Sequence, residues 1–382
     1  MKKNPSIKLS ALVIIGCLLS VDTNAATVYK DEATRIDLWG RIWYGLRSGG
    51  QDNYNFDFSS GEINYEKTSK TTGSEFVDLG SRLGLRVDHS LNENLNAFLR
   101  LELRGRTDAR HSDGFNQVRN TYIGLKHSEL GSIQIGNFNS VLYELVSSVF
   151  ELSQDWVAHT ALDTGVIASN GDSLQYTSPN LHGLKLYGAV KHLSGNGSID
   201  AEHTDYSSGL SWHAGASYTS GSLYLAAAWN QSRHADKHQS MSHDGRGAYP
   251  GGKNLYGLAV KYDFTPSISG RMTYQKLGDP LPSELFVTNF STIEELWGLG
   301  ATWSYGSGEV FANIFRAGML NHALEDQNHY VLGATYRVAQ WPLFTFAEVY
   351  FKDTASSNDA RYAALNDLSF DPVYTIGARY NF

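Results

Sequence analysis

The segment PVYTIGARYNF, Pro372 to Phe382, ends the sequence with a strictly alternating pattern. Successive side chains of a β-strand point to opposite faces. The pattern therefore predicts a strand with one apolar, aromatic face, made of Tyr374, Ile376, Ala378, Tyr380 and Phe382. An open edge of this kind invites aggregation, and pairing the last strand with the first removes it. The segment favours a closed β-barrel, with the last strand of a soluble β-sandwich as the alternative.

The other end of the chain predicts a secretory signal over residues 1–25. A lysine-rich start precedes an apolar run over 9–19, and Thr23-Asn24-Ala25 supplies a small-residue cleavage site. The mature chain is therefore expected to begin at Ala26. A lipoprotein cleavage box ending at Cys17 is the alternative, although the apolar run continues beyond that cysteine.

Cleavage after Ala25 removes the only cysteine, which excludes disulfides, thiolate metal sites and a cysteine nucleophile. It also removes three positive charges and one negative charge, so the formal charge changes from −8 to −10, which argues against nucleic acid as a partner. No later apolar stretch approaches the roughly 20 residues of a membrane helix. A membrane protein without such helices must be a closed barrel, because its backbone polar groups must pair internally.

Alternating segments of about ten residues follow one another along the chain, separated in turn by short and long connections, as in transmembrane barrels. About sixteen such segments are present, near 35–46, 75–89, 95–106, 117–127, 132–138, 173–177, 183–191, 210–218, 222–231, 254–264, 267–277, 295–305, 309–317, 329–338, 343–352 and 372–382.

Sixteen strands leave a water-filled lumen, because barrel diameter grows with strand number. The predicted fold is therefore all-β: a 16-stranded antiparallel transmembrane β-barrel over 26–382. The face that alternation assigns to lipid carries aromatic residues near the strand ends, which suits the interfacial girdles of such barrels. These residues are Trp229, Tyr256, Tyr262, Trp297, Trp303, Tyr330 and Tyr336.

One connection, over about 137–171, is far longer than a turn and contains no lysine or arginine. Connections of that length are usually functional or disordered. The apolar residues of this one favour a packed segment, and we expect it to fold inward as a constriction loop. Its acidic residues are Glu144, Glu151, Asp155 and Asp163.

The strands before this loop carry the opposite charge. Parity places six arginines on the lumen side: Arg41, Arg82, Arg86, Arg100, Arg104 and Arg119. A basic wall opposite an acidic loop would produce a transverse field, focused where low-dielectric walls crowd the water. The sequence therefore predicts a pore that filters small hydrophilic solutes and ions by charge and size.

Four stretches carry a resemblance to a known family: VYKDEATRIDLWGR (28–41), SRLGLRV (81–87), RNTYIGLKHSELGSIQIGNF (119–138) and the terminal Phe382. In them the chain resembles the general porins of Gram-negative outer membranes, which are trimeric sixteen-stranded diffusion channels. The resemblance implies an outer-membrane location, a homotrimer, and contact with membrane lipid and lipopolysaccharide. It also implies that Tyr380 and Phe382 form the signal read by the barrel-assembly machinery.

The resemblance further implies that Arg41, Arg82 and Arg119 form the basic cluster at the constriction, and that Glu151 and Asp155 lie in the loop that faces it. Two departures put selectivity and pore size in doubt. The family's proline-glutamate-phenylalanine-glycine-glycine turn is replaced by the stretch 153–156, and a further family arginine falls near Ser169.

Other functions remain open. In a sugar-specific porin, Trp39, Trp43 and Trp156 would offer flat surfaces to sugar rings. In an outer-membrane hydrolase, His111 to Asp113 or His243-Asp244 would supply catalytic residue types, although both lie in loops. We expect no enzyme activity, cofactor or metal, and we interpret the His-rich loop 232–243 as an exposed polar loop. A purely adhesive barrel is the remaining alternative.

Overall fold

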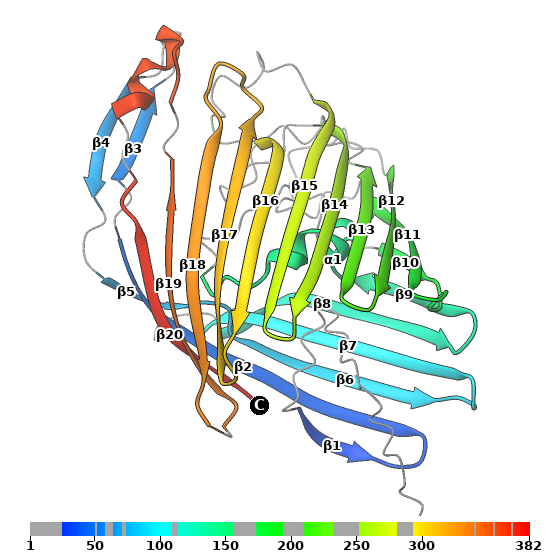
Figure 1. The fold of residues 1–382 in the computed structure, drawn as a ribbon. Coiled ribbons are helices and arrows are strands. Elements are labelled where there is room, and N and C mark those ends of the chain that lie inside the picture. The colour runs from blue at the N-terminus through cyan, green and yellow to red at the C-terminus, as the bar shows by residue number, and fades with distance from the viewer. Residues whose placement is uncertain are drawn as a thin grey trace, which may run out of the picture.

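A ring of antiparallel strands forms the body of the protein in the computed structural model (Figure 1). The structure describes residues 25–49, 52–57, 64–70, 74–108, 114–155, 173–193, 209–231, 252–280, 293–339, 341–353, 356–367 and 370–382. Its 18-stranded sheet includes two short strands, β1 (Ala26–Lys30) and β5 (Ser74–Asp78), which both lie along β2. The remaining sixteen strands close the ring, which confirms the predicted fold class.

In order around the ring, these strands are β2 (Thr34–Ser48), β6 (Arg82–Ser90), β7 (Leu95–Arg106), β8 (Gly114–His127), β9 (Gly131–Asn137), β10 (Ser173–Thr177), β11 (Leu184–Leu193), β12 (Gly209–Ser220), β13 (Leu223–Gln231), β14 (Gly252–Thr265), β15 (Ile268–Pro280), β16 (Ile293–Ser304), β17 (Gly308–Met319), β18 (Gln327–Arg337), β19 (Leu343–Lys352) and β20 (Val373–Asn381). Short turns such as 128–130 and 221–222 lie at one end of the barrel, which we call the short-turn end. The opposite end is the long-loop end.

The last strand closes the barrel against the first strand of the ring. Residues 41–48 of β2 pair with residues 374–381 of β20. The backbone N–H groups of Gly40 and Phe382 each donate to the carbonyl of the other, at 2.8 and 2.9 Å. The same edge of β2 also pairs with β1, over residues 35–38 of β2, where Ala26 faces Leu38. The two ends of the described chain thus complete one edge together.

One predicted strand, 75–89, is interrupted. The chain leaves the ladder between β5 and β6 because the Asp78 carboxylate accepts the backbone N–H groups of Gly80 and Ser81, at 2.8 and 2.7 Å. Gly80 has a φ of +137°, a conformation that favours glycine. The interruption leaves the Gly80 carbonyl outside the strand ladder, where it can accept a hydrogen bond from Arg41 of β2.

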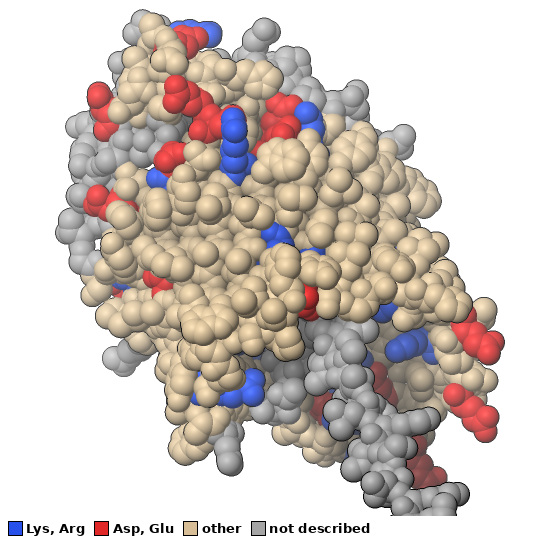
Figure 2. All heavy atoms as spheres, viewed as in Figure 1, with Lys and Arg blue, Asp and Glu red and all other residues tan. Residues whose placement is uncertain are grey.

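The two faces of the strands differ as alternation predicts. Along β17, the inward residues Phe311, Asn313 and Phe315 are buried, whereas the outward Ala312 and Ile314 are exposed. Most of the outward aromatic rings of the predicted girdles are likewise exposed. On the face seen in Figure 2, charged side chains are sparse along the middle of the strands and gather toward the two ends. This pattern fits a surface whose middle band lies in lipid.

Several smaller elements were not predicted. The hairpin of β3 (Asp52–Asp57) and β4 (Asn64–Lys70) lies in the first long loop, and the short helix η4 (Ala360–Asp367) lies before β20. Among the described residues, no helix is long and apolar enough to cross a membrane. The expected signal over 1–25 falls almost entirely outside the described residues.

Candidate functional site

The long connection after β9 folds into the lumen, as predicted. Its first part forms the helix α1 (Val141–Leu145) and the single turn η1 (Ser147–Phe150), and α1 is seen inside the ring in Figure 1. The Ser140 hydroxyl accepts the Tyr143 backbone N–H at 3.1 Å and caps the helix. Val141, Leu142 and Val146 are completely buried. The loop is therefore held mainly by apolar contact with the inner wall.

Glycines in the wall make room for this contact. A Cβ atom on Gly215 of β12 would lie 2.6 Å from Val141 and 2.7 Å from Leu145. On Gly257 of β14 it would lie 3.0 Å from Val146. Farther along, Phe150 packs on Phe315 with ring centroids 5.0 Å apart. The loop thus follows the wall from β12 toward β17.

Polar side chains anchor the loop where it reaches β19 and β20. The Glu348 carboxylate accepts the Ser153 hydroxyl at 2.7 Å and the Gln154 backbone N–H at 2.8 Å. Arg47 donates two hydrogen bonds to Asp155, at 2.7 and 2.5 Å, and Thr375 donates a third at 2.6 Å. We call these contacts of residues 153–155 the loop anchor.

Asp155 is therefore not placed as expected. It was predicted to face the arginine cluster together with Glu151, but it is 98 % buried against the wall, and its charge is paired with Arg47. The physical reason is that a carboxylate with almost no contact with water needs a charged partner and several donors, and β2 and β20 supply them.

The basic wall consists of two rows of arginines, one above the other. In the first row, Arg41 faces Arg82 across β2 and β6, and Arg82 faces Arg104 across β6 and β7. Like charges placed directly opposite each other are unfavourable. Glu102, from β7, offsets part of this repulsion: its carboxylate lies 2.9 Å from Arg82 and 3.1 Å from Arg119 of β8.

Arg41 is oriented by the interruption between β5 and β6. Its Nε donates to the Gly80 carbonyl at 2.9 Å, and its guanidinium carbon lies 4.4 Å from the centroid of the Trp43 ring. The local turn around Gly80 thus fixes the direction of one member of the cluster.

The second row lies closer to the short-turn end. Arg86 faces Arg100 across β6 and β7. Arg86 stacks 4.8 Å from the Trp39 ring, and Arg100 forms an ion pair of 2.7 Å with Asp88. Five of the six predicted arginines line the cavity described below, whereas Arg104 does not.

Two loop carboxylates have direct access to the lumen. Glu151 is exposed to the lumen water and interacts electrostatically with Arg119, Arg82 and Arg41. Crowding by the surrounding protein raises the pKa of Glu151 above its ordinary value of 4.5, and the three arginines offset only part of that effect. Glu144 is half-buried, lies near Gln175 and Lys185, and has its pKa raised by burial. Glu151 therefore faces the cluster, whereas Glu144 lies near β10 and β11.

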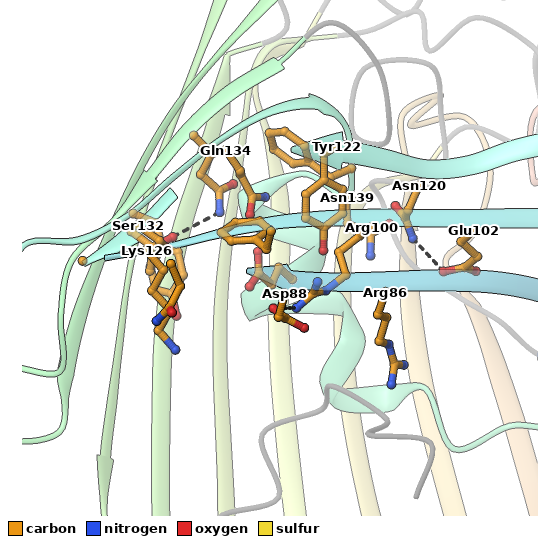
Figure 3. A pocket seen from close by; sticks show the side chains of 18 of the residues that line it. Arg86, Asp88, Arg100, Glu102, Asn120, Tyr122, Lys126, Ser132, Gln134 and Asn139 are labelled. Carbon is orange, nitrogen blue, oxygen red and sulfur yellow. Dashed lines mark hydrogen bonds and ion pairs between the residues drawn. The ribbon is translucent and has the colours of Figure 1, made fainter. Parts of the chain in front are cut away.

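These residues surround a single cavity of about 990 Å³. It extends from Arg41, Arg82 and Glu151 at the constriction to Lys126 and Asn180 near the short-turn end. Figure 3 shows polar and charged side chains pointing into it from neighbouring strands. It is the aqueous passage below the constriction loop.

The tryptophans proposed for sugar stacking are not available to solutes. Trp39 and Trp43 are 7 % and 5 % exposed. Trp39 lies flat over Gly84, where a Cβ atom would be 2.2 Å from its ring, and Trp43 packs edge-on against Phe346. Both rings thus support the arginines of the wall. Trp156 lies outside the described residues.

Four functional residues were missed by the sequence analysis. Arg47, Glu348 and Arg379 all share parity with inward residues of their strands, and that signal was sufficient to find them. Arg271 of β15 also points inward, donates to Thr302 and Asn313, and lies 5.3 Å from the Phe150 ring. Arg47 lies just beyond the predicted end of the first strand at residue 46, and the other three residues lie on strands after the loop.

Other candidate residues lie outside the described part of the chain. These are Asp163, Ser169, His111 to Asp113, His243-Asp244 and the His-rich loop 232–243. Within the described ranges, no group of three or more His, Cys, Asp or Glu side chains is arranged to hold a metal ion.

Comparison with known proteins gives a consistent picture. A family model described as Gram-negative porin matches residues 43–354. A monosaccharide porin of Halomonas sp. is 22 % identical over 376 residues, which cover 90 % of this chain and 94 % of that protein. Salmonella typhi OmpF in complex with daunomycin covers 94 % of this chain and 100 % of its own, with a TM-score of 0.63 and 17 % identity. The trimer form of in-vitro folded Vibrio cholerae OmpT covers 92 % and 100 %, with a TM-score of 0.58 and 14 % identity.

Proposed function

The chain belongs to the Gram-negative porin family, and from this membership we propose how its channel selects solutes. The protein is an outer-membrane channel for passive diffusion of ions and small hydrophilic solutes. We propose that the arginine rows and Glu151 form its filter, and that the filter favours anions. In the outer membrane the short-turn end faces the periplasm, as in other bacterial barrels.

The observation that carries this proposal is the unequal number of charges at the constriction. Among the described residues, the three arginines Arg41, Arg82 and Arg119 interact with two carboxylates, those of Glu102 and Glu151. Between low-dielectric walls an excess of fixed positive charge raises the local concentration of anions.

The test is the reversal potential across a planar bilayer in a salt gradient. The Arg82→Ala, Arg119→Ala double variant is expected to shift the potential toward cation preference. The anion-to-cation permeability ratio should fall roughly several-fold, because two focused positive charges are lost. Arg361→Ala is the matched control, because Arg361 lies in η4 and forms an exposed ion pair with Asp359. An unchanged potential in the double variant would remove the arginines from the filter.

We also propose that the channel works as a homotrimer, as the Vibrio cholerae relative does. The support is the fold shared with that trimer, which covers 92 % of this chain with a TM-score of 0.58. Mass measurement in detergent by light scattering tests the proposal, and a monodisperse monomer that conducts would contradict it. We further propose that residues 1–25 form a secretory signal and that Tyr380 and Phe382 form the signal for barrel assembly.

Selective sugar uptake is a second candidate function. One observation favours it: the relative that covers nearly the whole chain is described as a monosaccharide porin. Trp39 and Trp43 do not support it, because their rings are buried, so a sugar site would need other residues. For a hydrolase, no described residue offers comparable support, and we propose no catalytic role.

A further inference from the structure

We propose that the periplasmic part of the cavity binds the pyranose ring of a monosaccharide. The site lies below the constriction and is built from Asp88, Phe98, Arg100, Tyr122 and Gln134. The inference rests on the proposed channel function, because a solute must enter the lumen to reach these residues. Arg100 also belongs to the second arginine row, but none of the five residues belongs to the constriction cluster of Arg41, Arg82 and Arg119.

Strand register builds the site. One row runs across the four strands from β6 to β9. In it Asp88 faces Phe98, Phe98 faces Gly124, and Gly124 faces Gln134. The row therefore carries a carboxylate, an aromatic ring, a position without a side chain, and an amide. The next row toward the constriction places Arg100 opposite Tyr122. All five residues of the proposed site line the cavity.

The aromatic rings are open to the lumen. Phe98 and Tyr122 are half-buried, in contrast to Trp39 and Trp43, and their centroids lie 6.2 Å apart with an interplanar angle of 83°. The Phe98 ring lies over Gly124, where a Cβ atom would be only 2.3 Å from it. Glycine at 124 therefore permits this position of the ring. The Arg100 guanidinium carbon lies 5.4 Å from the Phe98 centroid, and Tyr122 also packs edge-on against Phe138, so part of each ring is covered. The half-buried remainder of the two perpendicular rings suits the C–H surface of a pyranose.

The polar groups suit hydroxyls better than an anion. Arg100 is already paired with Asp88 at 2.7 Å and donates to the carbonyls of Val87 and Leu99, both at 2.9 Å. Its charge is therefore compensated. Asp88 retains 48 % side-chain exposure, so its oxygens reach water and can accept from a solute. Gln134 offers both a donor and an acceptor. Hydroxyl groups, which donate and accept, match this mixture.

The size of the cavity agrees with a small solute. About 990 Å³ lies at the upper end of the range of about 300–1,000 Å³ for small-molecule sites. A sugar and several waters fit together, which is what passage through a channel requires, since a solute that fills the lumen completely would be released slowly.

The experiment compares glucose with sorbitol, which has the same number of carbon atoms but no ring. Purified full-length mature protein is placed in planar bilayers, and the conductance is measured as each solute is added, after correction for bulk conductivity. Glucose is expected to reduce the conductance with saturation, and sorbitol only in proportion to its concentration. Addition from the periplasmic side should act at a lower concentration than addition from the other side.

Variants locate the effect. Tyr122→Ala is expected to raise the half-saturating glucose concentration roughly five- to tenfold, as loss of one apolar ring contact does. Tyr122→Phe, which keeps the ring, should stay within about twofold of the wild type. Tyr336→Ala, which removes a ring on the outer face, is the matched control. Tyr122 is chosen because loss of the Phe98 ring would leave a gap over Gly124 and affect folding.

The outcomes separate the inference from the channel function. Protein that gives no conductance steps would overturn the channel and the sugar site together. Steps with identical glucose and sorbitol curves would overturn only the sugar site. Saturation by gluconate but not by glucose would show an anion site in its place and would also overturn it. Saturation by glucose that Tyr122→Ala leaves unchanged would move the site elsewhere.

Discussion

At the scale of single residues, the closing seam depends on one pair. Gly40 lies on the outer face of β2, and a Cβ atom there would be 2.4 Å from the Phe382 ring and 2.9 Å from the Arg82 carbonyl. The ring of the last residue therefore lies directly over the glycine. Phe382 contributes to the closed barrel through this contact as well as through its backbone hydrogen bonds.

Gly40→Ala is expected to destabilise the barrel. The added methyl group displaces the Phe382 ring and presses on the backbone, and overpacking of this kind costs about 1–3 kcal/mol in the free energy of unfolding. When samples are heated to increasing temperatures before gel electrophoresis, the band of the folded barrel should disappear at a lower temperature than in the wild type. Gly188→Ala is the control, since a Cβ atom at Gly188 meets nothing within 4 Å. Equal temperatures for the two variants would contradict the assigned role of the ring.

Single residues also show where sequence reasoning ends. Parity placed the arginines because a strand has a period of two. The loop has no period, and the resemblance to the family was what grouped Glu151 and Asp155 as facing acids. The fold turns one to the lumen and the other into the wall against Arg47. That difference depends on tertiary contacts with β2 and β20, which lie far away in the sequence.

At the scale of elements, the loop anchor determines how firmly the constriction is held. Asp155→Asn removes one partner of an ion pair in which Arg47 is a quarter exposed. The cost should therefore lie below the about 3–5 kcal/mol of a fully buried pair. We expect a severalfold increase in open-channel current noise, because the end of the loop is released. The folded barrel itself should persist.

Two variants serve as comparisons for this anchor. Glu348→Gln keeps an oxygen that accepts from the Ser153 hydroxyl, so its effect on the noise should be smaller. Asp359→Asn breaks the exposed pair with Arg361 of η4 and should have no effect. Noise that is equal in Asp155→Asn and Asp359→Asn would show that the ion pair does not hold the loop.

The helix of the loop gives a graded test. Gly215→Ala is expected to displace α1 toward the lumen and reduce the single-channel conductance. Gly257→Ala should reduce it less, because its Cβ atom would be 3.0 Å from the nearest loop atom and not 2.6 Å. Single-channel recordings at high salt measure the steric effect with little contribution from charge. A larger loss of conductance in Gly257→Ala than in Gly215→Ala would contradict this expectation and indicate that the wall moves in place of the helix.

All sixteen barrel strands were predictable as elements because alternation over about ten residues is a strong signal. The break between β5 and β6 was not, although the sequence contains Asp78 and Gly80 at it. A carboxylate that binds the backbone two and three residues later competes with the ladder locally, and an alternation pattern does not reveal that competition. The hairpin β3–β4 was missed because it lies in a polar stretch of sequence that was interpreted as a loop.

At the scale of the whole molecule, the charge balance of the lumen should depend on pH. Raised pKa values mean that Glu151 and Glu144 take up protons at a higher pH than an ordinary glutamate with a pKa of 4.5. As the pH falls from neutral, the loop loses negative charge while the arginines keep theirs. Anion preference should therefore increase, and the change should begin above pH 4.5.

Reversal potentials measured between neutral and mildly acidic pH check this expectation. Glu151→Gln removes the titrating group that faces the arginines, so this variant should show higher anion preference at neutral pH and a flatter pH profile. A wild-type profile that is already flat, or a shift toward cations on acidification, would contradict the assignment.

Closure of the ring through β2 and β20 also has a kinetic consequence. The contact between Gly40 and Phe382 joins residues separated by almost the entire chain. Contacts of such high sequence separation form slowly, because the entropy of closing a long loop is lost before the contact stabilises anything. The open sheet that precedes closure has two unpaired edges, and it must be protected until the final strand arrives. The protein therefore depends on a slow, final step that a sheet built from neighbouring hairpins alone would not have.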